Sequence, residues 1–264
     1  MSGRCEIDSA GRVTGPVAIA YNSPWPCRNG TPGGFESPAY GVVLHTEDGS
    51  EAGTRSWFND SASEVSAFFS VSLEGSVMQY GPLTGWMAWS QAEGNSRWIG
   101  IEHEDGGDPA KPFTAAQMNA TAHLTEVLSR HYGFPLADAT DPFTQHGVTL
   151  HSEGGVPFGD HLSCPGTVRA AQRPDIIARA KVIRALGAPV TPKPVRAKAH
   201  TTAGLGNLAE LAAANDTTPA AILQATAEQG AYPADITQWL DSIFSGAASA
   251  TTPMQEGLKL YIPA

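Results

Sequence analysis

The chain has 264 residues, of which 41% are hydrophobic and 16% charged, a composition typical of a globular protein with one sizeable core and room for a small second domain. Its 16 Lys and Arg against 26 Asp and Glu give a formal net charge of -10. Because affinity for phosphates depends on clustered basic side chains, this balance argues against a nucleic-acid-binding protein and against attachment to acidic membranes. No stretch approaches the length of a membrane span.

The first half of the chain contains strand patterns. ESPAYGVVLHTEDGS predicts a short buried strand over Tyr40–Leu44 that ends at the Asp48–Gly49 turn. SAFFSVSLEGSVMQY, residues 66–80, predicts a hairpin with its turn around Glu74–Gly75. RWIGIEHE, residues 97–104, predicts a further strand.

Helices and one more strand follow. Residues 113–133 predict a helix that begins with a capping box of Thr114 and Gln117 and stops at Gly133. GVTL, residues 147–150, repeats the strand-then-histidine arrangement, and residues 173–187 predict a last helix. This order predicts an α/β domain over residues 1–187, with a central mixed β-sheet flanked by helices.

Residues 188–201 are rich in proline and basic residues and predict a linker. Residues 202–264 then predict a separate small α+β domain. Its expected parts are two helices, NLAELAAAN and TTPAAILQATAEQG, and a closing strand in EGLKLYIP.

Two segments of the first domain nearly repeat one another: LHTEDGS from Leu44 and LHSEGGV from Leu150. Each places a histidine directly after an apolar strand, where the sheet fixes the backbone and the imidazole emerges at its edge. Cys164, in DHLSCPG, is a third candidate ligand, because the Pro165–Gly166 turn can point its thiolate back. Two histidines and one thiolate leave a tetrahedral zinc ion one open position, as in catalytic sites.

These residues resemble a known family, the zinc-dependent N-acetylmuramoyl-L-alanine amidases that share a fold with peptidoglycan-recognition proteins and include phage endolysins. The resemblance covers about Tyr40 to Ala185 and includes VVLHT, the hairpin, AWSQAEGNSRWIGIEHE, LHSEGG and DHLSCPG in the family's order. It implies that His45, His151 and Cys164 bind Zn²⁺. It further implies that Glu102 acts as general base on a zinc-activated water, which cleaves the amide bond between muramic acid and the L-alanine of the stem peptide.

The chain departs from the family pattern two residues before the last ligand, where Leu162 replaces a polar residue that helps to stabilise the oxyanion. The adjacent His161 is a catalytic candidate that could donate the missing hydrogen bond. Trp89 and Asn95 are candidates for substrate binding.

The second domain resembles a LysM module, a small fold that binds glycans containing N-acetylglucosamine. Together the two resemblances imply a monomeric phage endolysin whose partner is bacterial peptidoglycan. Since MSGRCEIDSAGRV lacks the apolar core of a signal peptide, we expect synthesis in the host cytoplasm and release to the cell wall through a holin-type pore. The alternatives are a recognition protein that has lost catalysis and a zinc peptidase that cuts within the stem peptide.

Overall fold

The computed structural model describes residues 4–36, 38–187, 197–201, 211, 222 and 259–263. The chain divides into two compact units, Met1–Ala180 and Lys181–Ala264. No helix in the described part of the chain is long and apolar enough to cross a membrane.

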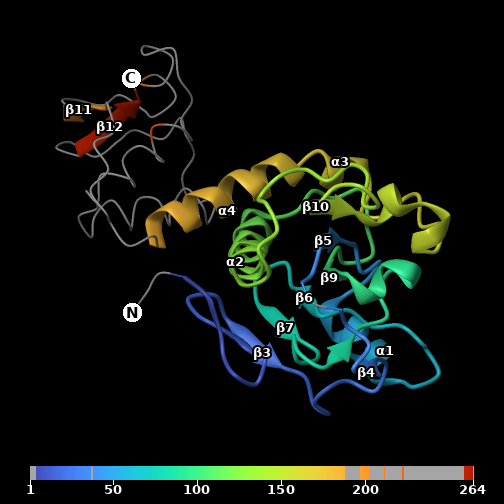
Figure 1. Cartoon of the computed structure of the whole chain (residues 1–264). Coiled ribbons are helices and arrows are strands. Elements are labelled where there is room, and N and C mark those ends of the chain that lie inside the picture. The colour runs from blue at the N-terminus through green and yellow to red at the C-terminus, as the bar shows by residue number, and fades with distance from the viewer. Residues whose placement is uncertain are drawn as a thin grey trace. The chain divides into compact units, whose positions relative to one another are not determined.

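A six-stranded mixed sheet forms the centre of the first unit (Figure 1). Its strands, in spatial order, are β10 (Gly147–Leu150), β5 (Gly41–Leu44), β9 (Trp98–His103), β6 (Phe69–Val71), β7 (Val77–Gln79) and β3 (Ile19–Tyr21). The first four strands are parallel, β7 runs antiparallel to β6, and β3 is parallel to β7. The predicted α/β class with a central mixed sheet is confirmed, and so are the five predicted strands.

The predicted helices of this unit are also confirmed. α2 (Ala115–Tyr132) has the capping box of Thr114 and Gln117, and it ends at Gly133, whose φ of 83° is the left-handed conformation that glycine adopts readily. α4 (Arg173–Gly187) begins with Pro174 in its first turn. The short α3 (Thr167–Ala170) precedes it.

Several short elements were not predicted. The 3₁₀ helices are η1 (Ala92–Ser96), η2 (His151–Gly154) and η3 (Val156–Phe158), and the two-residue strands β1 (Glu6–Ile7), β2 (Val13–Thr14), β4 (Thr31–Pro32) and β8 (Trp86–Met87) form two small antiparallel pairs. Helix α1 (Glu51–Asn59) was also missed. Its sequence contains an internal Gly53, a residue that disfavours helices, and its start has a local cap in which the Ser50 side chain accepts a hydrogen bond from the Gly53 amide.

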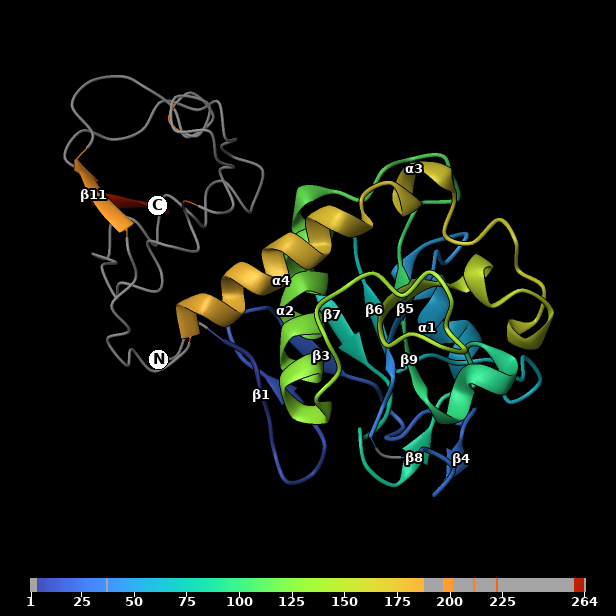
Figure 2. The same ribbon diagram turned by 45° about the horizontal axis from the view of Figure 1, so that its top comes forward.

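Helix α2 lies on one side of the sheet and α1 on the other (Figures 1 and 2). Strand β9 contributes side chains to both faces of the sheet, because successive side chains of a strand point to opposite faces. His103 points toward α2, where its Nε2 accepts a hydrogen bond from Thr121 Oγ1 (2.8 Å). Glu102 points to the α1 side and lines a cavity there. The face opposite α2 is therefore the one that holds the candidate site.

Strands β5 and β10 approach one another closely at Gly41 and Gly147. A Cβ added to Gly41 would lie 1.8 Å from the Gly147 carbonyl oxygen and 2.7 Å from the Trp98 ring. The pairing is in register along its length, from Gly41 opposite Gly147 to Leu44 opposite Leu150. These glycines therefore fix the spacing of the two strands that lead to His45 and His151.

Strand β11 (Ala197–Thr201) pairs antiparallel with β12 (Lys259–Pro263) in the second unit. β12 lies in the predicted closing strand, and β11 lies in the last residues of the predicted linker. Leu211 and Ile222, one from each predicted helix, are helical and buried. The rest of the predicted LysM-like domain lies outside the described residues.

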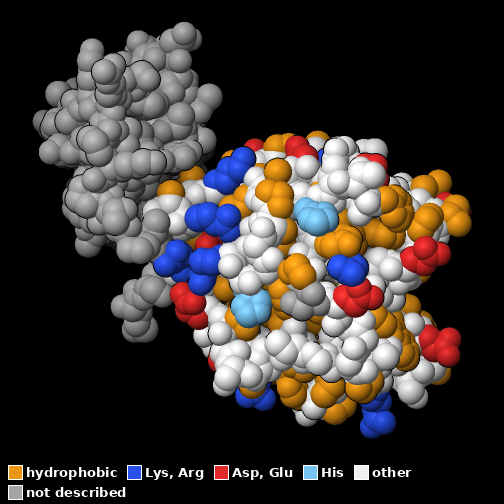
Figure 3. Space-filling model, viewed as in Figure 1, with side chains coloured by type: hydrophobic (Ala, Val, Ile, Leu, Met, Phe, Trp, Pro, Cys, Tyr) orange, Lys and Arg blue, Asp and Glu red, His pale blue; other side chains and the backbone are white. Residues whose placement is uncertain are grey.

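On the face of the molecule seen in Figure 3, apolar and polar side chains are interspersed, and the Lys and Arg side chains gather mainly over α4. Exposed apolar atoms scattered in this way are ordinary for a folded protein.

The close approach at Gly41 yields a prediction for stability. We expect Gly41→Ala to lower the free energy of unfolding by about 1–3 kcal/mol, because the new methyl group meets backbone atoms that cannot move aside. Urea denaturation measures this change. Gly49→Ala is the matched control, since its Cβ would meet its nearest neighbour, the Glu47 carbonyl oxygen, at 3.9 Å. Equal denaturation midpoints for the two variants would contradict the assigned register.

Candidate metal centre

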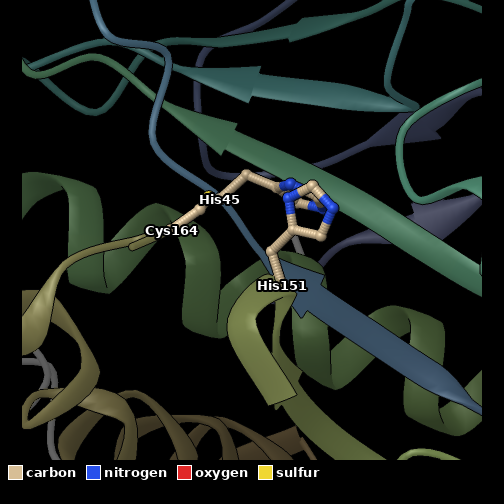
Figure 4. Close-up of side chains that lie close together, drawn as sticks. All are labelled: His45, His151 and Cys164. Atoms are coloured by element: carbon tan, nitrogen blue, oxygen red, sulfur yellow. The ribbon is translucent and has the colours of Figure 1, made fainter. Parts of the chain in front are cut away.

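The two histidines of the near-repeat lie side by side at the ends of adjacent parallel strands. Because Leu44 pairs with Leu150 across β5 and β10, the residues that follow them, His45 and His151, emerge at the same sheet edge. Their ring centroids are 4.3 Å apart and their planes are inclined by 56°, and the two rings lie together in Figure 4. The near-repeat therefore reflects two equivalent strand ends that supply the same type of side chain to one point.

Cys164 reaches this point from the loop between η3 and α3. The Thr46 amide donates a hydrogen bond to Cys164 Sγ (3.4 Å), and the Ser152 amide donates to the Cys164 carbonyl oxygen (2.9 Å). The residue directly after each histidine therefore contacts the cysteine. One potential ligand atom from each of His45, His151 and Cys164 lies within 4.8 Å of the other two, so the three side chains could hold a metal ion.

A hydrogen bond to Phe158 fixes the proton on the His151 ring. His151 Nε2 lies 2.8 Å from the Phe158 carbonyl oxygen, and since a carbonyl only accepts, Nε2 must donate. Nδ1 then keeps its lone pair and is free to bind a cation. Phe158 is itself fixed, because it packs in a buried cluster with Val43, Trp98 and Ala139.

Glu102 lies beside the three candidate ligands. Its Oε1 is 3.7 Å from His45 Nδ1, too far for a hydrogen bond, and its side chain is only 14% exposed. Its Oε2 is buried and has no hydrogen-bond partner within the described part of the chain. A buried carboxyl oxygen without a partner is costly unless it serves a ligand or a reaction.

Burial favours the uncharged form of every group at this centre. It holds the pKa of His45 well below its ordinary value and lowers the pKa of His151 to about 4, so both rings are neutral and able to act as ligands at pH 7. Burial also raises the pKa of the Cys164 thiol to about 12 and raises the pKa of Glu102 well above its ordinary value. A cation entering the site would therefore displace the thiol proton, and its charge would compensate the thiolate.

A cavity of about 800 Å³ opens over this centre. The side chain of Trp57 from α1, which is 56% exposed, and that of Trp89 form part of its wall. Cavities of this volume accommodate small ligands or a segment of a larger one. The potential metal ligands and Glu102 lie among the lining residues, so a bound molecule could reach them.

The structure places the remaining predicted site residues as follows. Trp89 lines the cavity, and its Nε1 donates to Thr31 Oγ1 (2.8 Å). His161 is exposed, lines the cavity, and stacks on His151 with ring centroids 4.6 Å apart. Leu162 beside it is 67% exposed. The stacking places His161 next to a potential ligand, and its catalytic role stays a prediction.

Asn95 is the other residue predicted to bind substrate, and that role stays a prediction. It is not among the described residues that line the cavity. Its side-chain oxygen accepts hydrogen bonds from the amides of Ser90 (2.8 Å) and Gln91 (2.6 Å). Asn95 therefore shapes the loop that follows Trp89, and its effect on the cavity is indirect.

Sequence reasoning missed several residues around this centre. Trp57 lies on a helix that was not predicted, and the buried Arg169 and Asp105 are not distinguished by any pattern in the sequence. Thr46 and Ser152 occupy equivalent positions after the two histidines of the near-repeat, and the sequence assigned neither a role.

Comparison with known proteins identifies a family. The family model described as N-acetylmuramoyl-L-alanine amidase matches residues 35–167, which is half of the chain. The chain is 33% identical over 98 residues to N-acetylmuramoyl-L-alanine amidase A of Achromobacter lyticus, and the match spans 37% of the chain and 55% of that relative.

Among solved structures, the hydrolase AmiA of Staphylococcus aureus is 21% identical, with a TM-score of 0.46 over 64% of this chain and 84% of AmiA. The N-acetylmuramoyl-L-alanine amidase LysC of Clostridium intestinale is 19% identical, with a TM-score of 0.43 over 63% of this chain and 97% of LysC.

The geometry predicts that Cys164 is required for metal binding and not for folding. We expect Cys164→Ser to reduce the metal content to well below one ion per chain after dialysis, because a hydroxyl is a far weaker ligand than a thiolate. Elemental analysis measures the metal, and circular dichroism measures the fold. Cys27→Ser, at a buried cysteine whose Sγ donates to the Asn29 carbonyl oxygen, is the control and should keep its metal. Full metal content in the Cys164 variant would remove this cysteine from the ligand set.

Proposed function

Because the chain belongs to the N-acetylmuramoyl-L-alanine amidase family, we propose that it is a zinc hydrolase of bacterial peptidoglycan. The bond cleaved is the amide between the lactyl group of N-acetylmuramic acid and the L-alanine of the stem peptide. One observation supports this more than any other. His45, His151 and Cys164 converge beside the unpartnered carboxyl group of Glu102 at the base of a cavity.

The three converging side chains fit zinc. Two imidazole nitrogens and one thiolate are ligands that zinc prefers, and a site with three protein ligands keeps one position open, as in catalytic zinc enzymes. The hydrogen bond from His151 Nε2 to a backbone carbonyl is the usual support of a metal-binding histidine. Zinc bound there would supply a Lewis acid that polarises the scissile carbonyl and makes water a stronger acid.

Glu102 is the group that takes and returns a proton in this proposal. It acts as base only when ionised, and a cation bound to the neighbouring ligands would lower its raised pKa. Its Oε2 has no partner within the described residues, so this oxygen can accept a proton from water and later deliver it to the leaving amine of L-alanine. The carboxyl group is fixed on the central strand β9, which keeps it beside His45.

The cavity walls suit an amphipathic glycopeptide. Trp57 and Trp89 offer aromatic surface to a sugar ring or an alanine side chain. His161, which is exposed and stacked on His151, can donate a hydrogen bond to the carbonyl oxygen under attack, in place of the polar residue replaced by Leu162.

The test is mass spectrometry of the soluble products released from purified peptidoglycan, with and without a chelator. Free stem peptides that begin at L-alanine, lost with the chelator and restored by zinc, would support the amidase. Products cut within the stem peptide would instead support a zinc peptidase. An absence of products from the zinc-loaded protein would support a binding protein without catalysis.

Replacement of Glu102 separates metal binding from catalysis. We expect Glu102→Gln to retain zinc and to lower turnover by about 10²–10⁴-fold, because the amide has the same shape and cannot accept the proton. Product release from peptidoglycan measures turnover. Glu104→Gln is the control, since the Glu104 side chain accepts a hydrogen bond from the Leu73 amide (2.9 Å) and should leave turnover unchanged. Near-normal turnover in the Glu102 variant would exclude this carboxylate as the base.

The proposal has two finer parts, a role as a phage endolysin released through a holin-type pore and glycan binding by a LysM-like domain over residues 202–264. Pairing of β11 with β12 at the two ends of that region is compatible with a small α+β domain. We expect deletion of residues 202–264 to weaken cosedimentation with cell walls and to spare cleavage of soluble muropeptides. Unchanged cosedimentation would count against glycan binding by this region.

A further inference from the structure

Arg169 is a buried cation that joins the segments around the candidate metal centre. It lies in α3, shortly after Cys164, and its side chain is 0% exposed. Its Nε donates to the Lys111 carbonyl oxygen (2.9 Å) and its Nη2 to the Glu104 carbonyl oxygen (3.0 Å). Its guanidinium also lies 4.8 Å from the centre of the Phe113 ring. A charge buried this deeply persists only with such complete hydrogen bonding.

The remaining contacts of Arg169 lead to Cys164 through Thr46. Arg169 Nη1 donates to Thr46 Oγ1 (3.0 Å) and to the His103 carbonyl oxygen (3.1 Å). The Thr46 hydroxyl then donates to Asp105 Oδ2 (2.7 Å). Thr46 is held between a buried cation and a buried carboxylate, and its own amide donates to Cys164 Sγ.

The hydrogen bonds of Arg169 and Thr46 restrain both the strand end that carries His45 and the loop that carries Cys164. Thr46 follows His45 directly, so the hydrogen bonds to its side chain restrain the strand end that holds one potential ligand. Arg169 follows Cys164 in the chain, so the same bonds restrain the loop that supplies another. Arg169 and Asp105 are not among the described residues that line the cavity, nor are they among the three candidate ligands.

We propose that Arg169, acting through the Thr46 hydroxyl and Asp105, is a positioning residue that holds Cys164 at ligand distance from His45. The proposal rests on the metal centre of the proposed function. If it is right, changes in Arg169, Thr46 or Asp105 weaken metal binding. If these residues had a purely structural role, the same changes would lower stability and leave metal affinity unchanged.

The experiment is a titration of the full-length chain with zinc in competition with a chromophoric chelator. We expect Thr46→Val, which keeps the amide and removes the hydroxyl, and Arg169→Lys, which keeps the charge and loses the planar fork, to weaken zinc binding by about 10–100-fold. Thr46→Ser restores a hydroxyl and should bind within about threefold of wild type. Cobalt loading supplies a second readout, because the thiolate-to-cobalt absorption band should weaken or shift in the first two variants and not in Thr46→Ser.

Arg130→Lys is the matched control. Arg130 lies on α2, donates to the Cys5 carbonyl oxygen and pairs with Glu6 and Glu126, so its replacement tests the loss of an arginine network that is not part of the centre. It should lower stability without changing zinc affinity. If Arg169→Lys fails to fold, Thr46→Val decides the matter. Wild-type zinc affinity and an unchanged cobalt spectrum in a folded Thr46→Val would overturn the inference, whereas a wild-type chain that binds no zinc would overturn the proposed function as well.

Discussion

The parallel, in-register pairing of β5 with β10 is the constraint on which the candidate site depends. Two glycines, Gly41 and Gly147, allow the strands to approach closely, and the register then brings His45 and His151 to the same sheet edge. Cys164 accepts hydrogen bonds from the amides of Thr46 and Ser152, the residues that directly follow the two histidines. Two of the three potential ligands are therefore placed by the sheet itself, and the third is bonded to its end. A site of this kind is as rigid as the sheet that supports it.

The second principle of the centre is the burial of its ionisable side chains. Burial lowers the pKa of both imidazoles and raises the pKa of the Cys164 thiol and of the Glu102 carboxyl group, so it favours their uncharged forms. The same burial strengthens any interaction with a cation, because the surrounding dielectric is low. The only fully buried cation near the ligands in the described part of the chain is Arg169, which is satisfied by its own hydrogen bonds. His45, His151 and Cys164 could therefore hold a cation that enters from the cavity.

The strands that carry the two histidines and the helix α2 could be predicted from the sequence, because they depend on patterns within short segments of the chain. Apolar runs that end in histidine predicted β5 and β10, and capping residues predicted α2, because backbone preferences act over a few residues. Residues such as Arg169 and Asp105 could not be predicted, since their roles depend on which distant carbonyl groups meet them after folding. Helix α1 was missed because it is short and contains Gly53, which disfavours a helix. Asn95 was predicted to bind substrate, and its side-chain oxygen accepts hydrogen bonds from Ser90 and Gln91 of its own loop.

Strand β9 has a consequence for folding accuracy. Its neighbouring residues Glu102 and His103 face opposite sides of the sheet, one toward the cavity and one toward Thr121 of α2. A slip of one residue in the pairing would exchange them, leaving an imidazole in the cavity and a carboxyl group against the buried helix. The slipped arrangement would lose packing on both faces together. A slip that would remove Glu102 from the cavity is thus also one that would break the contact of His103 with α2, so selection for stability also keeps Glu102 in place.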